Sequence, residues 1–416
     1  MLKFILIFIL GILTPLRFTP IIQNTINVVP FACFAFFFVT IKDMSPKKTF
    51  LAGLTLGIAY FSSGLYWIYH AIHHYGNASI FISSLITVLL ILTLSLFIAM
   101  PVYLTNLVCK KTSPLKKVTL LYPASMMVFE WLRGHLIFSG FPWLLIGYSQ
   151  THTIFGSLAP IIGVLGLSLT VYSISGLVAS LSMRFTKKQG QIASLTLFFI
   201  LCASVYAGTI KFTYTDHLPI NIALIQGNIK QSLKYQPNEL DNNINTYYKL
   251  TEQALKEQGK HTLVVWPEGA IPAIINAKNV QPHLAKVKQL LRKYKSYLIS
   301  GTMYTDPNTS KTYNTVVRMS YLPNAKNQYY FKHNIVPFGE YFPLQFITKP
   351  LMDSLNIPFS QLSAGAYNQP TMRVDNYTVA PFICFDAAYS NFVADNTKGK
   401  SLIVIVSDDS WFGDTI

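Results

Sequence analysis

The chain has 416 residues, of which 51% are hydrophobic and only 12% are charged, and its net charge is +16. A composition this apolar and this poor in charge excludes an ordinary soluble globular protein and indicates that part of the chain lies in lipid. The excess of basic residues does not indicate nucleic-acid binding, because the bases of the first half lie in short clusters between apolar runs and form no aromatic–basic stripe.

The charged residues divide the chain into two parts. Residues 1–210 contain 13 Lys and Arg residues and two acids, whereas residues 211–416 contain 20 basic and 15 acidic residues. We therefore predict a transmembrane helical domain over residues 1–210 and a water-exposed domain over residues 211–416. The spacing of the Cys and His residues resembles no zinc site, and we expect no structural metal.

Seven apolar stretches predict seven helices in the first domain. Most of them reach the ~20 residues that a membrane-spanning helix needs. The first stretch is short and follows Lys3, as in a signal peptide, but no small-residue cleavage pattern comes after it, so we expect an anchor. The stretches cover residues 4–16, 22–41, 50–69, 78–108, 118–147, 154–183 and 190–210.

The basic residues of the connecting loops predict how the helices are oriented. Alternate loops carry eleven Lys and Arg residues, whereas the intervening loops carry essentially only Arg17. Loops rich in Lys and Arg face the cytoplasm. We therefore expect a cytoplasmic N-terminus and, after an odd number of spans, an extracytoplasmic position for the residues that follow Thr209.

Glu130 and Arg133 lie three residues apart in the fifth apolar stretch, on one face of a helix. Each charge needs a partner inside a bilayer, so a structural ion pair is one interpretation. The other interpretation is functional, with residues 130–134 and 140–143 shaping an entry for a lipid headgroup near the outer leaflet. The sequence leaves both open.

From Ile220 onward, short β-rich runs alternate with helical ones, which indicates an α/β sheet domain. We expect helices over residues 238–258, with Asn238 as the N-cap, and over residues 280–295. Residues 341–366 are too apolar for an exposed loop, and we expect a lid that dips into the outer leaflet. The predicted strands cover residues 220–226, 261–266, 297–303, 313–320, 327–332, 377–385 and 401–407.

Three polar residues of catalytic type, Glu268, Lys332 and Cys384, lie at the ends of three of these strands. Open α/β sheets bind their ligands at strand ends, so the three residues are candidates for one site. Cys384 is the only cysteine after residue 202 and has no disulfide partner in its domain. A solitary thiol is a hazard in an oxidising compartment, so a nucleophile competes with a buried small hydrophobe as its interpretation.

The three residue types together suit nucleophilic catalysis. A cysteine nucleophile needs a base to remove its proton and a positive group near the oxyanion that forms on attack. Taken singly, Glu268 is also compatible with a surface acid after a Trp-Pro turn, and Lys332 with a solvated lysine. Their combination with Cys384 favours the catalytic interpretation.

These residues and the motifs around them resemble the nitrilase superfamily, whose members use a Glu, Lys, Cys triad, and within it the apolipoprotein N-acyltransferase family. The resemblance extends along nearly the whole chain and depends on an ordered series of motifs. The motifs are Glu130-Trp-Leu-Arg-Gly134, Gly140-Phe-Pro-Trp143, Tyr148-Ser-Gln150, Ala223-Leu-Ile-Gln-Gly-Asn-Ile229, Gln231-Ser-Leu-Lys234, Trp266-Pro-Glu-Gly-Ala-Ile-Pro272, Lys332-His-Asn-Ile-Val-Pro-Phe-Gly-Glu-Tyr-Phe-Pro343, Ile383-Cys384-Phe385-Asp386 and Trp411-Phe-Gly-Asp414.

The resemblance implies a fold, a reaction and a location. The fold is an N-terminal polytopic α-helical membrane bundle followed by an extracytoplasmic, nitrilase-like αββα sandwich. The reaction moves an acyl chain from a phospholipid, usually phosphatidylethanolamine, through a thioester on Cys384 to the α-amine of a diacylated apolipoprotein. Glu268 is the base and Lys332 stabilises the oxyanion, with ping-pong kinetics and no cofactor. The location is the inner membrane of a Gram-negative bacterium, with the catalytic domain of a monomeric enzyme in the periplasm.

The resemblance also assigns roles to residues around the triad. Glu340 and Asp386 are expected to support the site. Trp143, Tyr235 and Phe385 are expected to contact the substrates.

Two departures from the family pattern bear on activity. Asp408 stands where an asparagine is usual, and we expect the added charge to raise the pKa of the thiol. The chain stops at Ile416, where family members continue with further strands and a closing helix, so we expect a C-terminally incomplete domain. An inactive remnant and a membrane-tethered carbon–nitrogen hydrolase, with water in place of the amine, are the alternatives. A transporter or receptor is disfavoured, because no paired broken helices carry substrate-path charges.

Overall fold

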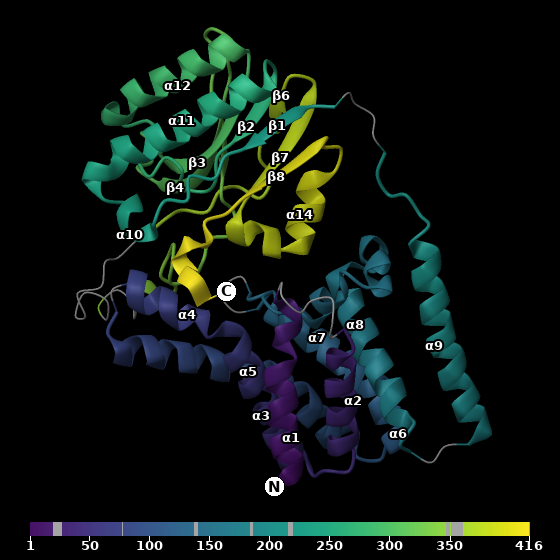
Figure 1. The fold of residues 1–416 in the computed structure, drawn as a ribbon. Coiled ribbons are helices and arrows are strands. Elements are labelled where there is room, and N and C mark those ends of the chain that lie inside the picture. The colour runs from purple at the N-terminus through teal and green to yellow at the C-terminus, as the bar shows by residue number, and fades with distance from the viewer. Residues whose placement is uncertain are drawn as a thin grey trace. The chain divides into compact units, whose positions relative to one another are not determined.

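The computed structural model describes residues 1–19, 27–76, 78–136, 140–183, 186–214, 219–346, 350 and 361–415. The chain divides into two compact units, residues 1–215 with residues 414–416, and residues 216–413. The described part of the first unit is helical, and the second unit combines helices with two β-sheets (Figure 1). Half of the predicted lid, residues 347–349 and 351–360, lies outside the described residues.

Apolar runs and helix-start signals together define the helices of the first unit. The hydroxyl of Ser79 accepts a hydrogen bond from Ile82 N at 3.3 Å at the start of α5, and Thr186 and Gln189 form a capping box at the start of α9. The helices are α1 (Leu2–Leu13), α2 (Val29–Ile41), α3 (Pro46–Leu65), α4 (Trp67–His70), α5 (Ile80–Val108), α6 (Pro114–Lys116), α7 (Tyr122–Arg133), α8 (Ala159–Ser180) and α9 (Lys187–Ala207).

Two glycines allow α3 and α5 to pack at close range. A Cβ atom at Gly53 would lie 2.6 Å from the Cα atom of Ala99, and one at Gly57 would lie 2.7 Å from the Cα atom of Ser95. Small residues that let two helix backbones approach are the usual basis of helix association in lipid. The packing of this pair is therefore typical of a membrane protein.

Three described helical segments are long and apolar enough to cross a membrane, Ile80–Val108, Ile154–Ser180 and Lys187–Ala207. A fourth span exists if Pro46–Leu65 and Trp67–Tyr75, which are bent by 50°, count as one. In two of the other predicted stretches the helices, α1 and α2, have 12 and 13 residues and are roughly 18–20 Å long, short of the ~30 Å of a bilayer core. In a third stretch, helical turns run without a break from Pro114 to Arg133 through α6, a π-helical turn and α7, but they carry the four charged residues Lys116, Lys117, Glu130 and Arg133. The sequence-based count of seven spans is therefore larger than the three or four that the described helices support.

The second unit contains all seven predicted strands and both predicted helices. One short strand, β6, was not predicted, and Asn238 is not an N-cap, because it lies inside a 3₁₀ turn and α11 begins after Glu239. The strands are β1 (Asn221–Leu224), β2 (Thr262–Val265), β3 (Tyr297–Thr305), β4 (Thr312–Met319), β5 (Gln328–Phe331), β6 (Met372–Val374), β7 (Tyr377–Ile383) and β8 (Leu402–Val406), and the helices are α10 (Gln231–Lys234), α11 (Leu240–Gln258), α12 (Gln281–Tyr294) and α14 (Ser390–Thr397).

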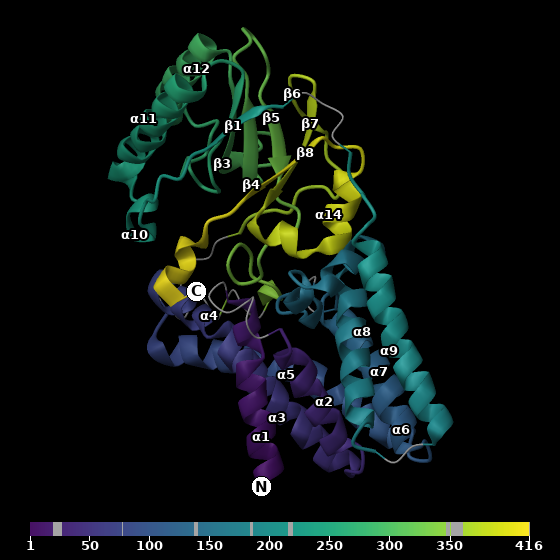
Figure 2. The same ribbon diagram turned by 45° about the vertical axis from the view of Figure 1, so that its right-hand side comes forward.

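Helices and a second sheet cover opposite faces of the larger sheet in this unit. The larger sheet has the order β1-β2-β3-β4-β5, parallel from β1 to β3 and antiparallel from β3 to β5. α11 and α12 pack on one face through a core that includes Leu255 and Leu291, and both views place these helices side by side (Figures 1 and 2). The smaller sheet, β6-β7-β8, packs on the other face through Val316 and Val379, and Phe392 of α14 packs against the smaller sheet.

Candidate active site

The structure brings Glu268, Lys332 and Cys384 together. Glu268 follows β2 after a Trp-Pro pair, whereas Lys332 directly follows β5 and Cys384 directly follows β7. Nζ of Lys332 lies 3.7 Å from Oε1 of Glu268. The charges of both residues act on the thiol of Cys384. The three residues therefore form one cluster at the ends of three strands.

Lys332 supplies the positive charge of this cluster. Its side chain is 2% exposed, and Nζ lies 2.9 Å from Oε2 of Glu340. Burial lowers the pKa of Lys332, but the charges of Glu340, Glu268 and Cys384 raise it by more, and the net pKa lies above the ordinary value. Lys332 is therefore an ammonium that can stabilise an oxyanion.

Glu340 is fixed on both of its carboxylate oxygens. Oε1 accepts a hydrogen bond from Nδ2 of Asn314 at 2.7 Å, and Oε2 accepts one from Val336 N at 2.8 Å besides the ion pair with Lys332. Its backbone oxygen accepts a hydrogen bond from Leu362 N at 2.7 Å. The structure places Glu340 where it can hold the ammonium of Lys332 in position.

The carboxylate of Glu268 is largely buried and accepts hydrogen bonds from two donors. Oε1 accepts from Nδ2 of Asn314 at 2.7 Å, and Oε2 accepts from the backbone N–H of Asp408 at 3.1 Å. Burial raises the pKa of Glu268 above its ordinary value, and the ammonium of Lys332 opposes this shift. A carboxylate with a raised pKa is better matched to accept a proton near neutral pH.

Cys384 has a left-handed backbone, with φ of 45°. Residues other than glycine rarely adopt this conformation, which costs roughly 1–3 kcal/mol and persists where the surroundings enforce it. Burial, followed by the charge of Glu268, raises the pKa of the thiol to about 12, and Lys332 and a hydrogen bond with Ser407 oppose the shift. Cys384 is therefore a neutral thiol at neutral pH, and it needs a base before it can attack.

Asp386 joins the segment after Cys384 to the segment after Lys332. Its fully buried carboxylate accepts hydrogen bonds from the hydroxyl of Tyr330 at 2.8 Å, from Asn334 N at 2.7 Å and from Ile383 N at 3.2 Å. Burial raises the pKa of Asp386, and these donors oppose the shift. Asp386 is placed to fix the nucleophile relative to the lysine.

The three predicted substrate-contacting residues have different surroundings. Tyr235 is 47% exposed, its ring centroid lies 6.4 Å from that of Trp411, and the charge of Glu268 acts on its hydroxyl. Phe385 is buried in the second unit. Trp143 belongs to the helical unit, where its ring centroid lies 5.8 Å from that of Trp67. Of the three, Tyr235 borders the carboxylates of the site.

Lys234 and Asp408 form a buried ion pair beside Glu268. Nζ of Lys234 lies 2.6 Å from Oδ2 of Asp408, with side-chain exposures of 6% and 10%, and it also donates to the backbone oxygen of Glu268 at 3.0 Å. The negative charge that Asp408 adds is thus neutralised by Lys234. The raised pKa of the Cys384 thiol comes from burial and from Glu268 instead.

Sequence reasoning missed Asn314 and the structural role of Lys234. Asn314 lies on β4, where asparagine is disfavoured, and an amide inside an otherwise Tyr-, Thr- and Val-rich strand was the available signal. Lys234 carried no such signal, because a lysine at the end of a short helix is usually solvated. Among the residues that the structure describes, no three His, Cys, Asp or Glu side chains are placed to hold a metal ion.

Gly301 on β3 creates the space for Glu268. A Cβ atom at this position would lie 2.5 Å from the Cα atom of Glu268 and 2.6 Å from the backbone oxygen of Pro267. Gly301→Ala should push the turn that carries Glu268 away from the sheet and slow the alkylation of the Cys384 thiol by iodoacetamide by about 100-fold, as expected for a displacement near 1 Å. The matched control is Gly134→Ala, where the nearest atoms to a Cβ lie at 3.5 Å. Equal alkylation rates in the two variants would contradict this role of Gly301.

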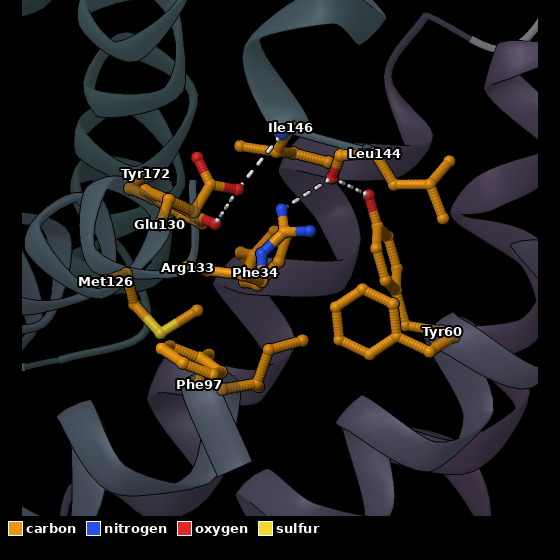
Figure 3. Close-up of a pocket in the computed structure, with 11 residues that line it drawn as sticks. Phe34, Tyr60, Phe97, Met126, Glu130, Arg133, Leu144, Ile146 and Tyr172 are labelled. Carbon is orange, nitrogen blue, oxygen red and sulfur yellow. Dashed lines mark hydrogen bonds between the residues drawn. The ribbon is translucent and has the colours of Figure 1, made fainter. Parts of the chain in front are cut away.

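Glu130 and Arg133 do not form an ion pair, which was one of the two interpretations of their spacing. Arg133 donates to the backbone oxygens of Phe141 and Trp143. It also donates to the backbone oxygen of Leu144, while Oε1 of Glu130 accepts from Ile146 N and the hydroxyl of Tyr172, both at 3.0 Å (Figure 3). The backbone carbonyl and N–H groups of the segment 141–146 need hydrogen-bond partners in an apolar interior. The side chains of Arg133 and Glu130 bind these groups instead of each other. The pair therefore anchors this segment, beside a cavity of about 10 Å³ that has room for one water at most.

Comparison with known proteins places both units in one family. Residues 10–177 match the apolipoprotein N-acyltransferase N-terminal domain, and residues 221–416 match the carbon-nitrogen hydrolase family. The chain is 33% identical to the apolipoprotein N-acyltransferase of Coxiella burnetii over 99% of this chain and 82% of that protein. It is 31% identical to that of Methylococcus capsulatus over 97% of this chain and 77% of that protein, and 32% identical to that of Haemophilus influenzae over 89% and 71%. The chain is therefore a membrane protein of the apolipoprotein N-acyltransferase family, acyltransferases of the nitrilase superfamily.

Proposed function

We propose that the chain moves an acyl chain from a phospholipid such as phosphatidylethanolamine to the α-amine of the diacylglyceryl-cysteine at a lipoprotein's N-terminus. Family membership supports the two lipid substrates. The observation that carries the proposal for the site is the ammonium of Lys332, buried between Glu340 at 2.9 Å and Glu268 at 3.7 Å beside a neutral thiol. This arrangement suits attack on an ester carbonyl.

In the first half of the reaction, Glu268 takes the proton of Cys384, and the thiolate attacks the carbonyl carbon of the phospholipid ester. The oxyanion that forms lies near the ammonium of Lys332, which stabilises it. The bond to the glycerol oxygen then breaks, the leaving oxygen takes the proton from Glu268, and a lysophospholipid departs. Cys384 is left as a thioester.

In the second half, the α-amine of the lipoprotein attacks the thioester carbonyl. Glu268 accepts the proton of the amine, the bond to Sγ of Cys384 breaks, and the thiol is restored. The donor product leaves before the acceptor reacts, so the kinetics are ping-pong, and no cofactor enters either half.

The proposal extends to the arrangement of the chain. Family membership supports a periplasmic catalytic domain over residues 211–416, in the inner membrane of a Gram-negative bacterium, and the Lys and Arg clusters of residues 1–210 support a cytoplasmic N-terminus. The layers α11 and α12, the two sheets, and α14 support an αββα sandwich for this domain.

The test is the intact mass of the purified, detergent-solubilised chain after incubation with phosphatidylethanolamine. An added acyl mass that hydroxylamine removes, and that is absent from Cys384→Ser and Glu268→Ala, is the expected result. Cys202→Ser is the matched control, because that exposed thiol lies in the helical unit, and it should acylate normally. No added mass on folded wild type would overturn the proposal. Release of the acyl chain to water, with none transferred to a diacylated lipopeptide, would indicate a hydrolase that uses water in place of the amine.

The acylation rate should fall as the solution is acidified, and the fall should begin at a higher pH than it would for a base with the pKa of an ordinary glutamate. Burial raises the pKa of Glu268 above 4.5, so protonation of the base, which stops proton transfer from Cys384, begins above that pH as the solution is acidified. Single-turnover acylation measured against pH gives the midpoint of this acidic limb. A midpoint at or below pH 4.5 would contradict the role of Glu268.

A further inference from the structure

Asn314 contacts both carboxylates of the proposed site through one nitrogen. Its Nδ2 atom donates to Oε1 of Glu268 and to Oε1 of Glu340, each at 2.7 Å. Its backbone oxygen accepts a hydrogen bond from Lys332 N at 2.9 Å. A single residue of β4 therefore fixes the two acids and the start of the segment that carries the ammonium.

The orientation of the Asn314 amide follows from its neighbours. An amide nitrogen has two N–H groups and no acceptor, so it can satisfy two carboxylate oxygens at once. The reverse orientation would place the amide oxygen against two carboxylates and repel both. The contacts therefore assign Nδ2 to this side and require acceptors on the facing oxygens of Glu268 and Glu340.

The two carboxylates differ in the hydrogen bonds that they already accept, and therefore in their capacity to take up a proton. Glu340 accepts from Asn314 on one oxygen and from Val336 N and Lys332 on the other. Glu268 accepts from Asn314 on Oε1 but only from Asp408 N, at a longer 3.1 Å, on Oε2. Oε1 of Glu268 also faces the ammonium of Lys332 at 3.7 Å, so of the two oxygens of Glu268 it is Oε2 that has the greater capacity to take a proton.

We propose that Asn314 is a positioning residue that keeps both carboxylates as acceptors and makes Oε2 of Glu268 the atom to which Cys384 gives its proton. The S–H bond of Cys384 breaks and an O–H bond forms on that oxygen, while Glu340 stays a counter-ion of Lys332. This inference rests on the proposed roles of Glu268, Lys332 and Cys384.

Other charges that face Glu268 are balanced around it. The titratable groups whose charges act on its carboxylate or lie against its backbone are Lys332, Glu340, Asp408, Lys234, Tyr235 and Cys384. The ammonium groups of Lys332 and Lys234 are paired with Glu340 and Asp408. Asn314 supplies two N–H donors and no charge. An aspartate of the same shape would supply no donor and would add a negative charge.

The test is alkylation of Cys384 by iodoacetamide, localised by peptide mass spectrometry and measured against pH in Asn314→Asp, Asn314→Ala and wild type. In this reaction the thiol proton leaves to Glu268, an S–C bond forms and iodide departs, so no lipid is needed. The new carboxylate should shift the acidic limb upward by about one pH unit or more and slow alkylation at pH 7 by about tenfold or more. Asn314→Ala, which loses the donors without adding charge, should shift the limb less and in the same direction.

Asn276→Asp is the matched control, because that exposed amide donates to Thr305 O outside the site, and it should keep the wild-type profile. An unshifted limb in folded Asn314→Asp, or an equal loss at every pH in both Asn314 variants, would overturn the inference and leave a structural residue. If Asn314→Asp does not fold, the pH profile of Asn314→Ala decides. If phospholipid does not acylate Cys384 but the alkylation profile of Asn314→Asp is shifted, the proposed function is wrong and the positioning role of Asn314 stands.

Discussion

Lys332→Met should abolish acylation of Cys384 and destabilise the folded second unit by roughly 3–5 kcal/mol, the usual cost of removing one partner from a buried ion pair. Methionine matches the length and volume of the lysine stem, so the change removes charge and little packing. Glu340 and Glu268 then face each other without a cation, and one of them takes up a proton. That proton occupies the base, and the oxyanion loses its positive partner.

The melting temperature of the detergent-solubilised full chain and the mass assay with phosphatidylethanolamine measure the two effects. The pKa of the carboxylate that becomes protonated is raised in the folded state, so the destabilisation should be largest at high pH and shrink as the pH falls through that pKa. Lys398→Met is the control, because that side chain is 76% exposed and its ion pair with Asp395 contributes little. Acylation by Lys332→Met at the wild-type rate would remove Lys332 from the mechanism.

Lys234→Met should lower the rate of Cys384 acylation by about 10- to 100-fold, and Asp408→Asn in the same chain should restore most of it. Without Lys234, the carboxylate of Asp408 is unpaired beside Glu268, whose Oε2 already accepts from Asp408 N. A like charge at this distance raises the pKa of Glu268 and of the thiol. The second substitution removes that charge while it keeps the backbone donor.

A double-mutant cycle measures the coupling between Lys234 and Asp408. We expect Asp408→Asn alone to lower the acylation rate only slightly, because the ammonium of Lys234 keeps its hydrogen bond to the backbone oxygen of Glu268. Lys256→Met is the matched control for an exposed pair, with Glu252, whose contribution is within about 0.5 kcal/mol. If the double variant is as slow as Lys234→Met, the charge of Asp408 is not the cause of the loss.

The strands that carry the site were predictable from the sequence because each is a short apolar run with polar ends. β2, β5 and β7 are buried on at least one face, and the residues that follow them are the ones free to carry chemistry. β6 was missed because three residues are too few for a periodic pattern. The helix count failed for a different reason, since hydropathy gives apolar stretches but not where α1 and α2 end.

The clustering of Glu268, Lys332 and Cys384 was predictable because each is a polar residue at the end of a predicted strand, whereas the residues that hold them in place have no such signal. Asn314 meets Glu268 across 46 positions and Lys234 meets Asp408 across 174, and no local pattern encodes contacts at such separations. The error over Glu130 and Arg133 has the same origin. Their spacing along a helix is local, but their hydrogen-bond partners in the structure lie eight or more residues away along the chain.

The parallel pairing of β7 with β8 has a consequence for how the protein tolerates insertions. Ile383 lies opposite Val406, so the residue after each strand, Cys384 on one side and Ser407 on the other, emerges at the same level. A one-residue insertion within β8 would reverse the direction of its side chains and carry Asp408 away from Lys234. The part of the connection that follows Asp386, which contains α14, is free of that constraint, so a tag grafted at the exposed end of α14 should leave the nucleophile aligned.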